Sequence, residues 1–161
     1  MKVSYTHVIP ATFDAVIEAY RSTEFYSEKQ KASGALSVEI LETEDQDGGV
    51  FRMKARCSEP SRVPKFLRKS DVDTYLDDTL LDPQAGTLTW KITPQIMGDV
   101  FFLSGRIDFA ADGDQTRVTY NTDLSVKIPL VGKKAEKIGL EKTEEETAKQ
   151  AAFLKKWVAE H

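Results

Sequence analysis

Apolar and polar residues alternate along most of this chain, and the alternation begins near its start. Over residues 2–9, one face of the predicted β-strand carries Val3, Tyr5, His7 and Ile9. Apolar residues then recur at helical spacing, and Pro10 and Thr23 suit the first residues of two helices. Gly34 suits the end of the second helix, because glycine tolerates the backbone conformation common there. Residues 2–34 therefore predict a strand followed by two short helices.

Two further strands form a predicted hairpin. The dipeptide Asp47-Gly48 favours a two-residue turn between residues 36–45 and 49–57. The covered face of this hairpin would carry Val38, Ile40, Phe51, Met53, Ala55 and Cys57. Two acidic residues near the tip, Glu42 and Glu44, fall on the same face, which indicates fraying there.

Four more strands are predicted over residues 71–81, 87–93, 101–109 and 117–128. Their alternation is one-sided, which is typical of an antiparallel sheet covered on one face. The predicted inward residues are Val72, Thr74, Leu76, Leu80, Leu88, Trp90, Ile92, Phe101, Leu103, Gly105, Ile107, Phe109, Val118, Tyr120, Thr122, Leu124 and Val126. Asp71, Asp73 and Asp77 are expected to face outward, where they would pair with the basic stripe of Arg52, Lys54 and Arg56.

The last segment lacks strand alternation and is rich in Glu, Lys and Ala, which predicts one long helix over residues 133–159. Its covered stripe would carry Leu140, Thr147, Ala151, Leu154 and Val158. Gly139 would allow a bend or a close backbone approach.

This order of elements resembles the helix-grip fold of the START-like (SRPBCC) superfamily. The stretches IPATFDAVIEAY and IDFAADGDQTRVTYNTDL carry the resemblance further. It implies a single α+β domain over residues 1–161, in which a curved seven-stranded antiparallel sheet wraps around the long C-terminal helix. It also implies an internal cavity for an apolar ligand, in a bacterial branch that is catalogued as a domain of unknown function.

Composition narrows the functional classes. The net charge of −4 argues against general nucleic-acid binding, because a basic excess is needed to neutralise phosphates. Two histidines and one cysteine provide no metal-ligand spacing, and no cofactor fingerprint or catalytic motif is present, so we expect no metal and no cofactor. The lone cysteine and the absence of a signal-peptide pattern favour the cytoplasm.

The connections between strands differ at the two ends of the predicted sheet. Short polar turns gather at one end, whereas the other end holds the longer connections 58–70, 93–99 and 127–134. The apolar residues predicted at a cavity mouth there are Val63, Phe66, Leu67, Ile96, Met97 and Val131. Alternatively, these side chains plug the end of the core.

The predicted cavity lining combines inward strand positions with the covered stripe of the C-terminal helix. The candidates are Tyr5, His7, Phe51, Met53, Thr74, Trp90, Phe101, Leu103, Tyr120, Leu140, Glu144, Thr147 and Ala151. The small residues of the helix either leave space or allow close packing. Glu144 either acts inside the cavity or reaches water at the edge of the stripe, and His7 either orients a ligand or forms a core hydrogen bond to a backbone carbonyl.

The sequence is consistent with three functions. The first is a carrier or sensor for a lipid-like or aromatic molecule. The second is a cyclase-like or hydrolase-like enzyme, for which only Tyr5, His7 and Glu144 offer polar groups. The third is transient contact with an anionic membrane through the four basic residues of residues 62–69, each of which would contribute about 1 kcal/mol.

Overall fold

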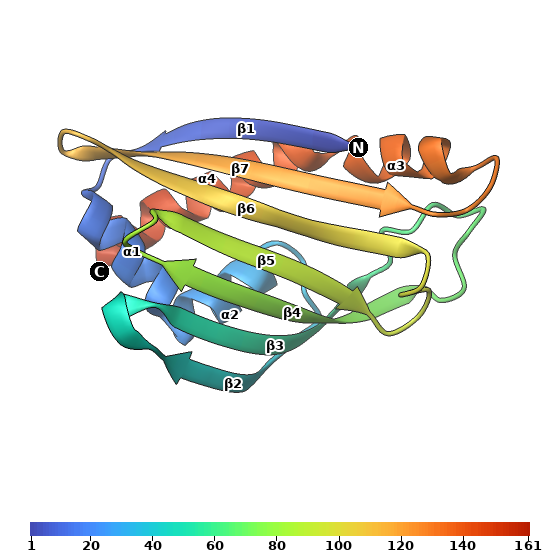
Figure 1. Ribbon diagram of the computed structural model, residues 1–161, viewed down its shortest axis with the longest axis horizontal. Helices are drawn as coiled ribbons and strands as arrows, with labels where there is room; N and C mark the ends of the chain where they lie inside the picture. The colour runs from blue at the N-terminus through green and yellow to red at the C-terminus, as the bar shows by residue number, and fades with distance from the viewer.

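The structure is a computed structural model that describes residues 1–161. One seven-stranded antiparallel sheet has the strand order β1-β7-β6-β5-β4-β3-β2. The strands are β1 (Lys2–Ile9), β2 (Ser37–Asp45), β3 (Phe51–Pro60), β4 (Val72–Asp82), β5 (Thr87–Pro94), β6 (Phe101–Asp112) and β7 (Gln115–Val126). The helices are α1 (Phe13–Arg21), α2 (Thr23–Ala32), α3 (Gly132–Leu140) and α4 (Thr143–Glu160), with a short 3₁₀ turn over Asp47–Gly49. The predicted fold class is confirmed, and α1, α2 and α4 lie behind one face of the sheet (Figure 1).

The two short helices begin with side-chain caps. Helix α1 begins at Phe13 rather than at Pro10, because the Thr12 hydroxyl accepts a hydrogen bond from the Ala15 amide. Helix α2 begins at Thr23 as predicted, and Ser22 caps it by accepting from the Phe25 amide. The Ser22 cap lies at the turn between the helices, and Tyr20, Phe25 and Tyr26 on either side of it are buried in the core.

The register of the β2–β3 hairpin is correct in its first half and wrong near the tip. Ile40 lies opposite Ala55 as predicted, but a bulge follows, so that Glu42 lies opposite Lys54. The turn is longer than two residues, because the Gln46 amide donates to the Val50 carbonyl and both Gly48 and Gly49 have positive φ. The bulge adds one residue to β2 and moves its acidic side chains off the covered face, so they do not mark fraying.

The predicted facing of β4 is inverted. Leu81 pairs with the buried Phe51 and Asp77 with the buried Ala55, so these β4 residues face inward. The residues predicted inward, Val72, Thr74, Leu76 and Leu80, take the outward parity, and the expected aspartate ion pairs are wrong. Lys54 pairs with Asp78 and Arg56 with Glu39 instead. Both faces of β4 carry apolar residues, so alternation alone did not decide its orientation.

The C-terminal segment contains a long helix, but it is not one continuous helix from residue 133. Helix α3 packs through Ala135 and Leu140 on a small cluster with Leu124 and Val126 of β7. Helix α4 packs through Ala151 and Leu154 on the main core. The two helices therefore pack on separate clusters. At Gly139 a side chain rather than a backbone comes close, since an added Cβ would lie 2.6 Å from Leu124 Cδ2.

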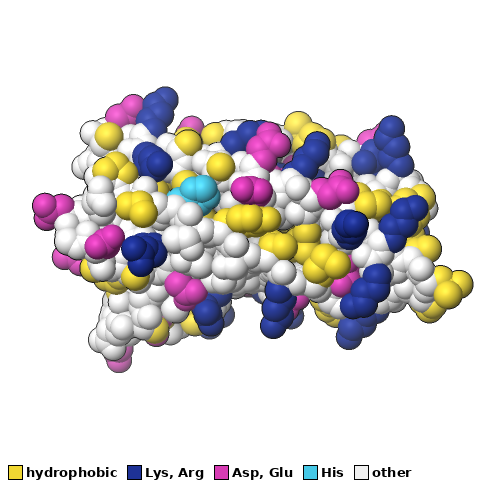
Figure 2. Space-filling model, turned by 90° about the horizontal axis from the view of Figure 1, so that it is seen from above, with side chains coloured by type: hydrophobic (Ala, Val, Ile, Leu, Met, Phe, Trp, Pro, Cys, Tyr) yellow, Lys and Arg dark blue, Asp and Glu magenta, His cyan; other side chains and the backbone are white.

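The two ends of the sheet differ as expected. The turns between β2 and β3, β4 and β5, and β6 and β7 gather at one end, and the three longer connections gather at the other (Figure 1). Lys and Arg side chains stand beside apolar ones at this second end, which is on the right in Figure 2. No helix has the length and apolar character needed to cross a membrane.

Candidate ligand-binding cavity

A cavity of about 540 Å³ lies between the inner face of the sheet, α2 and the first turns of α4. This volume falls in the range of small-molecule sites. Most of the sheet contributes to it, together with Val63 and Pro64 of the β3–β4 connection and Ile96 of the β5–β6 connection. The predicted cavity and its position under the elaborated end are therefore present in the structure.

The apolar wall comes from β5, β6 and β7. Its members include Leu88, Trp90, Ile92, Phe101, Leu103, Ile107 and Leu124. Trp90 lies opposite Gly105, where an added Cβ would come within 2.3 Å of the indole. The absence of a side chain at Gly105 therefore lets the indole pack directly against β6.

Many of the predicted lining residues border this cavity. They are Met53, Thr74, Trp90, Phe101, Leu103, Tyr120, Leu140 and Thr147, with Val63 and Ile96 from the predicted mouth. Thr74 does so despite its outward parity, and its hydroxyl is hydrogen-bonded to that of Ser58. Of these residues, Met53, Trp90, Phe101, Leu103 and Tyr120 occupy the inward strand positions that the alternation predicts.

Other predicted residues lie elsewhere. Phe51 and Ala151 are buried in the main core, so the small side chain of Ala151 serves close packing rather than cavity space. Glu144 is exposed, and Glu146 borders the cavity in its place. Tyr5 does not line the cavity either.

His7 fits neither reading of the sequence. Its ring packs edge-on against Tyr120 at a centroid distance of 6.0 Å, outside the cavity lining. Its buried Nε2 has no hydrogen-bond partner, so the expected bond to a backbone carbonyl is not formed by that nitrogen. The three polar groups on which the enzyme hypothesis depended, on Tyr5, His7 and Glu144, are therefore not brought together in the cavity.

The remaining predicted mouth residues also lie outside the lining: Phe66, Leu67, Met97 and Val131. Phe66 is exposed and lies under the Lys134 ammonium, which is 5.2 Å from the ring centroid. Leu67 packs against the small cluster of β7 and α3. The β3–β4 connection thus has an exposed apolar side chain, Phe66, and a packed one, Leu67.

A polar wall that sequence reasoning missed faces the apolar wall. The Tyr26 hydroxyl of α2 donates to Asp77 Oδ2 at 2.7 Å and lies 3.4 Å from Cys57 Sγ. Burial raises the pKa of Asp77, while the hydrogen bond from Tyr26 and the charge of Lys29 act against this rise. Burial also raises the pKa of Tyr26 and of the Cys57 thiol. The sequence does not predict Asp77 in the cavity, because its alternation points to the opposite facing for β4.

Lys29, one helical turn after Tyr26, lines the same wall. Its ammonium lies 5.5 Å from the ring centroids of both Tyr20 and Tyr26 and 5.8 Å from that of Phe25. Burial lowers the pKa of Lys29, and the charge of Asp77 opposes this change. The sequence signal was the spacing of Tyr26 and Lys29 on one face of a short helix, three residues apart.

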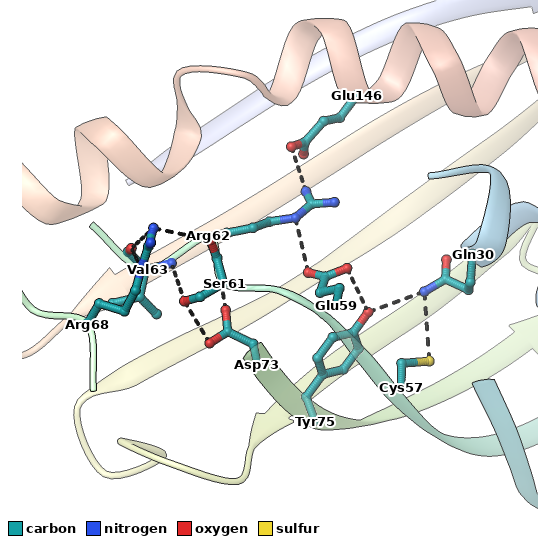
Figure 3. A network of polar contacts seen from close by, with 10 residues as sticks. All are labelled: Gln30, Cys57, Glu59, Ser61, Arg62, Val63, Arg68, Asp73, Tyr75 and Glu146. Carbon is teal, nitrogen blue, oxygen red and sulfur yellow. Dashed lines mark hydrogen bonds and ion pairs between the residues drawn. The ribbon is translucent and has the colours of Figure 1, made fainter. Parts of the chain in front are cut away.

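The β3–β4 connection is fastened across the cavity by Arg62. Its guanidinium pairs with Glu59 of β3 at 3.0 Å and with Glu146 of α4 at 2.5 Å (Figure 3). Asp73 holds the same stretch by accepting from the Ser61 hydroxyl and the Arg62 amide. The basic residues of this connection therefore include a structural link between the sheet and the helix.

This network continues along the cavity wall through neutral groups. The Tyr75 hydroxyl donates to Glu59 at 3.4 Å, and Gln30 of α2 donates to Tyr75 at 3.4 Å (Figure 3). Burial raises the pKa of Glu59 and of Tyr75. No group of three or more His, Cys, Asp or Glu side chains is arranged to hold a metal ion.

Solved structures of the same fold cover nearly the whole chain. An aromatase/cyclase from Streptomyces sp. R1128 is 17% identical, with a TM-score of 0.72 over 99% of this chain and 93% of that chain. A START superfamily protein from Mycobacterium smegmatis is 19% identical, with a TM-score of 0.64 over 99% and 97%. Norcoclaurine synthase from Thalictrum flavum is 19% identical, with a TM-score of 0.65 over 100% and 87%. At these identities the likeness shows the START-like helix-grip fold alone.

The sequence comparisons assign the family. No curated protein matches the chain in sequence. One family model matches residues 4–158, which is nearly the whole length. The chain therefore belongs to the family described as "Protein of unknown function (DUF2505)".

Proposed function

We propose that this protein binds an apolar small molecule in its internal cavity and acts as a carrier or sensor. The observation that carries the proposal is the cavity of about 540 Å³, with an apolar wall on one side and a polar wall on the other. A site of this kind buries the body of a ligand on apolar side chains and fixes its orientation through a few polar groups.

Proteins of the same fold support this proposal. Norcoclaurine synthase from Thalictrum flavum has been solved in complex with dopamine and hydroxybenzaldehyde. The fold thus accommodates small aromatic molecules in at least one protein. In this chain the aromatic and aliphatic side chains of β5 and β6 offer an apolar surface in the cavity.

Titration with an apolar fluorescent dye, N-phenyl-1-naphthylamine, tests the proposal. Leu103→Trp would fill the cavity, so this variant is expected to lose dye binding at least tenfold. Phe102→Trp is the matched control, because Phe102 is the next residue on β6 and is exposed on the outer face. Equal dye binding by the wild type and both variants would contradict binding in the cavity.

A second candidate function is contact with an anionic membrane at the elaborated end of the sheet. Leu130 is fully exposed there with φ of +72°, a conformation that costs energy in a leucine. Lys133 and Lys134 lie close by in sequence and are exposed. Leu130→Ser is expected to reduce sedimentation with phosphatidylserine vesicles while dye binding is unchanged; sedimentation equal to that of the wild type would contradict this contact.

A further inference from the structure

The buried Oδ1 atom of Asp77 has no hydrogen-bond partner. The buried hydroxyl groups of Tyr20 and Tyr120 lie close enough together for each to affect the pKa of the other, and they have no partner outside this pair. All three residues line the cavity, although they come from α1, β7 and β4. Buried polar atoms in folded proteins are nearly always paired, so Asp77 Oδ1 is an acceptor that a donor on a bound molecule would satisfy.

Lys29 adds unused donors to the same region. Its ammonium contacts the Tyr20 and Tyr26 rings, and Tyr26 in turn is bonded to Asp77. The lysine forms no salt bridge, although it is close enough to Asp77 for each charge to affect the other. One region of the cavity therefore presents a free acceptor on Asp77 and free donors on Lys29.

The charges of the lining show which ligands this region disfavours. The cavity is bordered by two cations and four carboxylates: Lys29, Arg62, Glu59, Asp73, Asp77 and Glu146. Arg62 is already paired with two of the carboxylates, so it is not free to bind an anion. The remaining net charge of the lining is negative, and it opposes the entry of a free carboxylate such as that of a fatty acid.

We propose that the cavity selects an uncharged apolar molecule that carries a hydroxyl group, which donates to Asp77 and accepts from Lys29. This inference rests on the proposed function and names the class of ligand for the same cavity. A hydroxyl group fits because it both donates and accepts a hydrogen bond. A hydrocarbon would leave both protein groups unpaired, and a carboxylate would meet the charge of Asp77.

Three probes of nearly equal size test this selectivity: naphthalene, 2-naphthol and 2-naphthoate, titrated at pH 7 by calorimetry. We expect 2-naphthol to bind about tenfold more tightly than naphthalene, the ratio for one well-formed hydrogen bond. We expect 2-naphthoate to bind most weakly. Equal binding of naphthol and naphthalene, or tightest binding of naphthoate, would overturn the inference while the proposed function stands. Failure of all three probes to bind would overturn both.

Two variants locate the effect. Asp77→Asn removes the charge, so we expect a smaller preference for naphthol and tighter binding of naphthoate. Lys29→Met removes the donors and the positive charge, so both naphthol and naphthoate are expected to bind more weakly. Lys31→Met is the control, since Lys31 is exposed on α2 and pairs with Glu28. A naphthol preference that survives unchanged in both cavity variants would overturn the assignment to these residues.

Discussion

At the scale of single residues, Asp77 is the least expected feature of the fold. Its side chain is almost completely buried on the inner face of β4, yet only one of its oxygens is hydrogen-bonded. Keeping a carboxylate there costs stability, because burial disfavours its charged form. A buried carboxylate with a raised pKa at the border of a cavity is a candidate functional group.

Asp77→Asn is expected to stabilise the protein at pH 7. The folded state raises the pKa of Asp77, so it holds the proton more tightly than the unfolded chain does. Stability is therefore lost as pH rises from the ordinary aspartate pKa, about 3.9, through the raised value. The asparagine variant should gain about 1.4 kcal/mol for each pH unit of that interval.

Urea denaturation at pH 7 and near pH 4 measures this gain. The gain should shrink toward zero at the lower pH, where Asp77 of the wild type is protonated. Asp71→Asn is the control, because Asp71 is exposed and lies just before β4. A gain of the same size at both pH values would rule out this explanation.

Gly105 is the second decisive residue. An added Cβ would lie 2.3 Å from both Trp90 Cζ2 and the Asn121 carbonyl oxygen. Gly105→Ala is therefore expected to destabilise the fold by about 1–3 kcal/mol and to displace the indole into the cavity. Urea denaturation and dye titration together check this, and a variant with wild-type stability and affinity would contradict the packing described.

At the scale of elements, the ion pair between Arg62 and Glu146 ties the β3–β4 connection to α4. Glu146→Gln breaks one of the two ion pairs of Arg62, and we expect faster exchange of bound dye because the connection is less firmly held. Both partners are substantially exposed, so the loss of stability should be less than about 1 kcal/mol. Glu144→Gln is the control on the same helix, since Glu144 is exposed and unpaired. Stopped-flow displacement rates that match in both variants would exclude a role in gating.

The same connection contains two apolar residues with different surroundings. Leu67 packs against the cluster of β7 and α3, so Leu67→Ser should cost about 1 kcal/mol or more. Phe66 is half exposed, and Phe66→Ser should change stability by less than about 0.5 kcal/mol. Thermal or urea unfolding of the two single variants measures both losses of stability. A larger loss in Phe66→Ser than in Leu67→Ser would contradict the assignment of Leu67 as the buried anchor.

The elements also show what the sequence could predict. Strands β5, β6 and β7 were predicted with correct facing because their apolar residues occupy one parity. Strand β4 was not, because Leu76 and Leu80 on one face compete with Tyr75 and Leu81 on the other. The polar wall was missed for that reason, and also because the Tyr26–Asp77 hydrogen bond joins residues 51 positions apart.

At the scale of the whole molecule, the two ends of the sheet are built differently. Short turns close one end, whereas the other end holds the three longer connections, of which the β3–β4 and β5–β6 connections border the cavity. This asymmetry was readable from loop length and composition. The division of the cavity into an apolar and a polar wall could not be predicted from the sequence, because it depends on how α2 and α4 pack over the sheet.

Native mass spectrometry of the protein purified from its own source tests the central claim most directly. We predict one non-covalently bound small molecule per chain, released on unfolding and absent from Leu103→Trp. The released compound should be uncharged and carry a hydroxyl group. A wild-type protein that shows only the mass of the bare chain, and gains no mass with either naphthalene or 2-naphthol, would contradict the account.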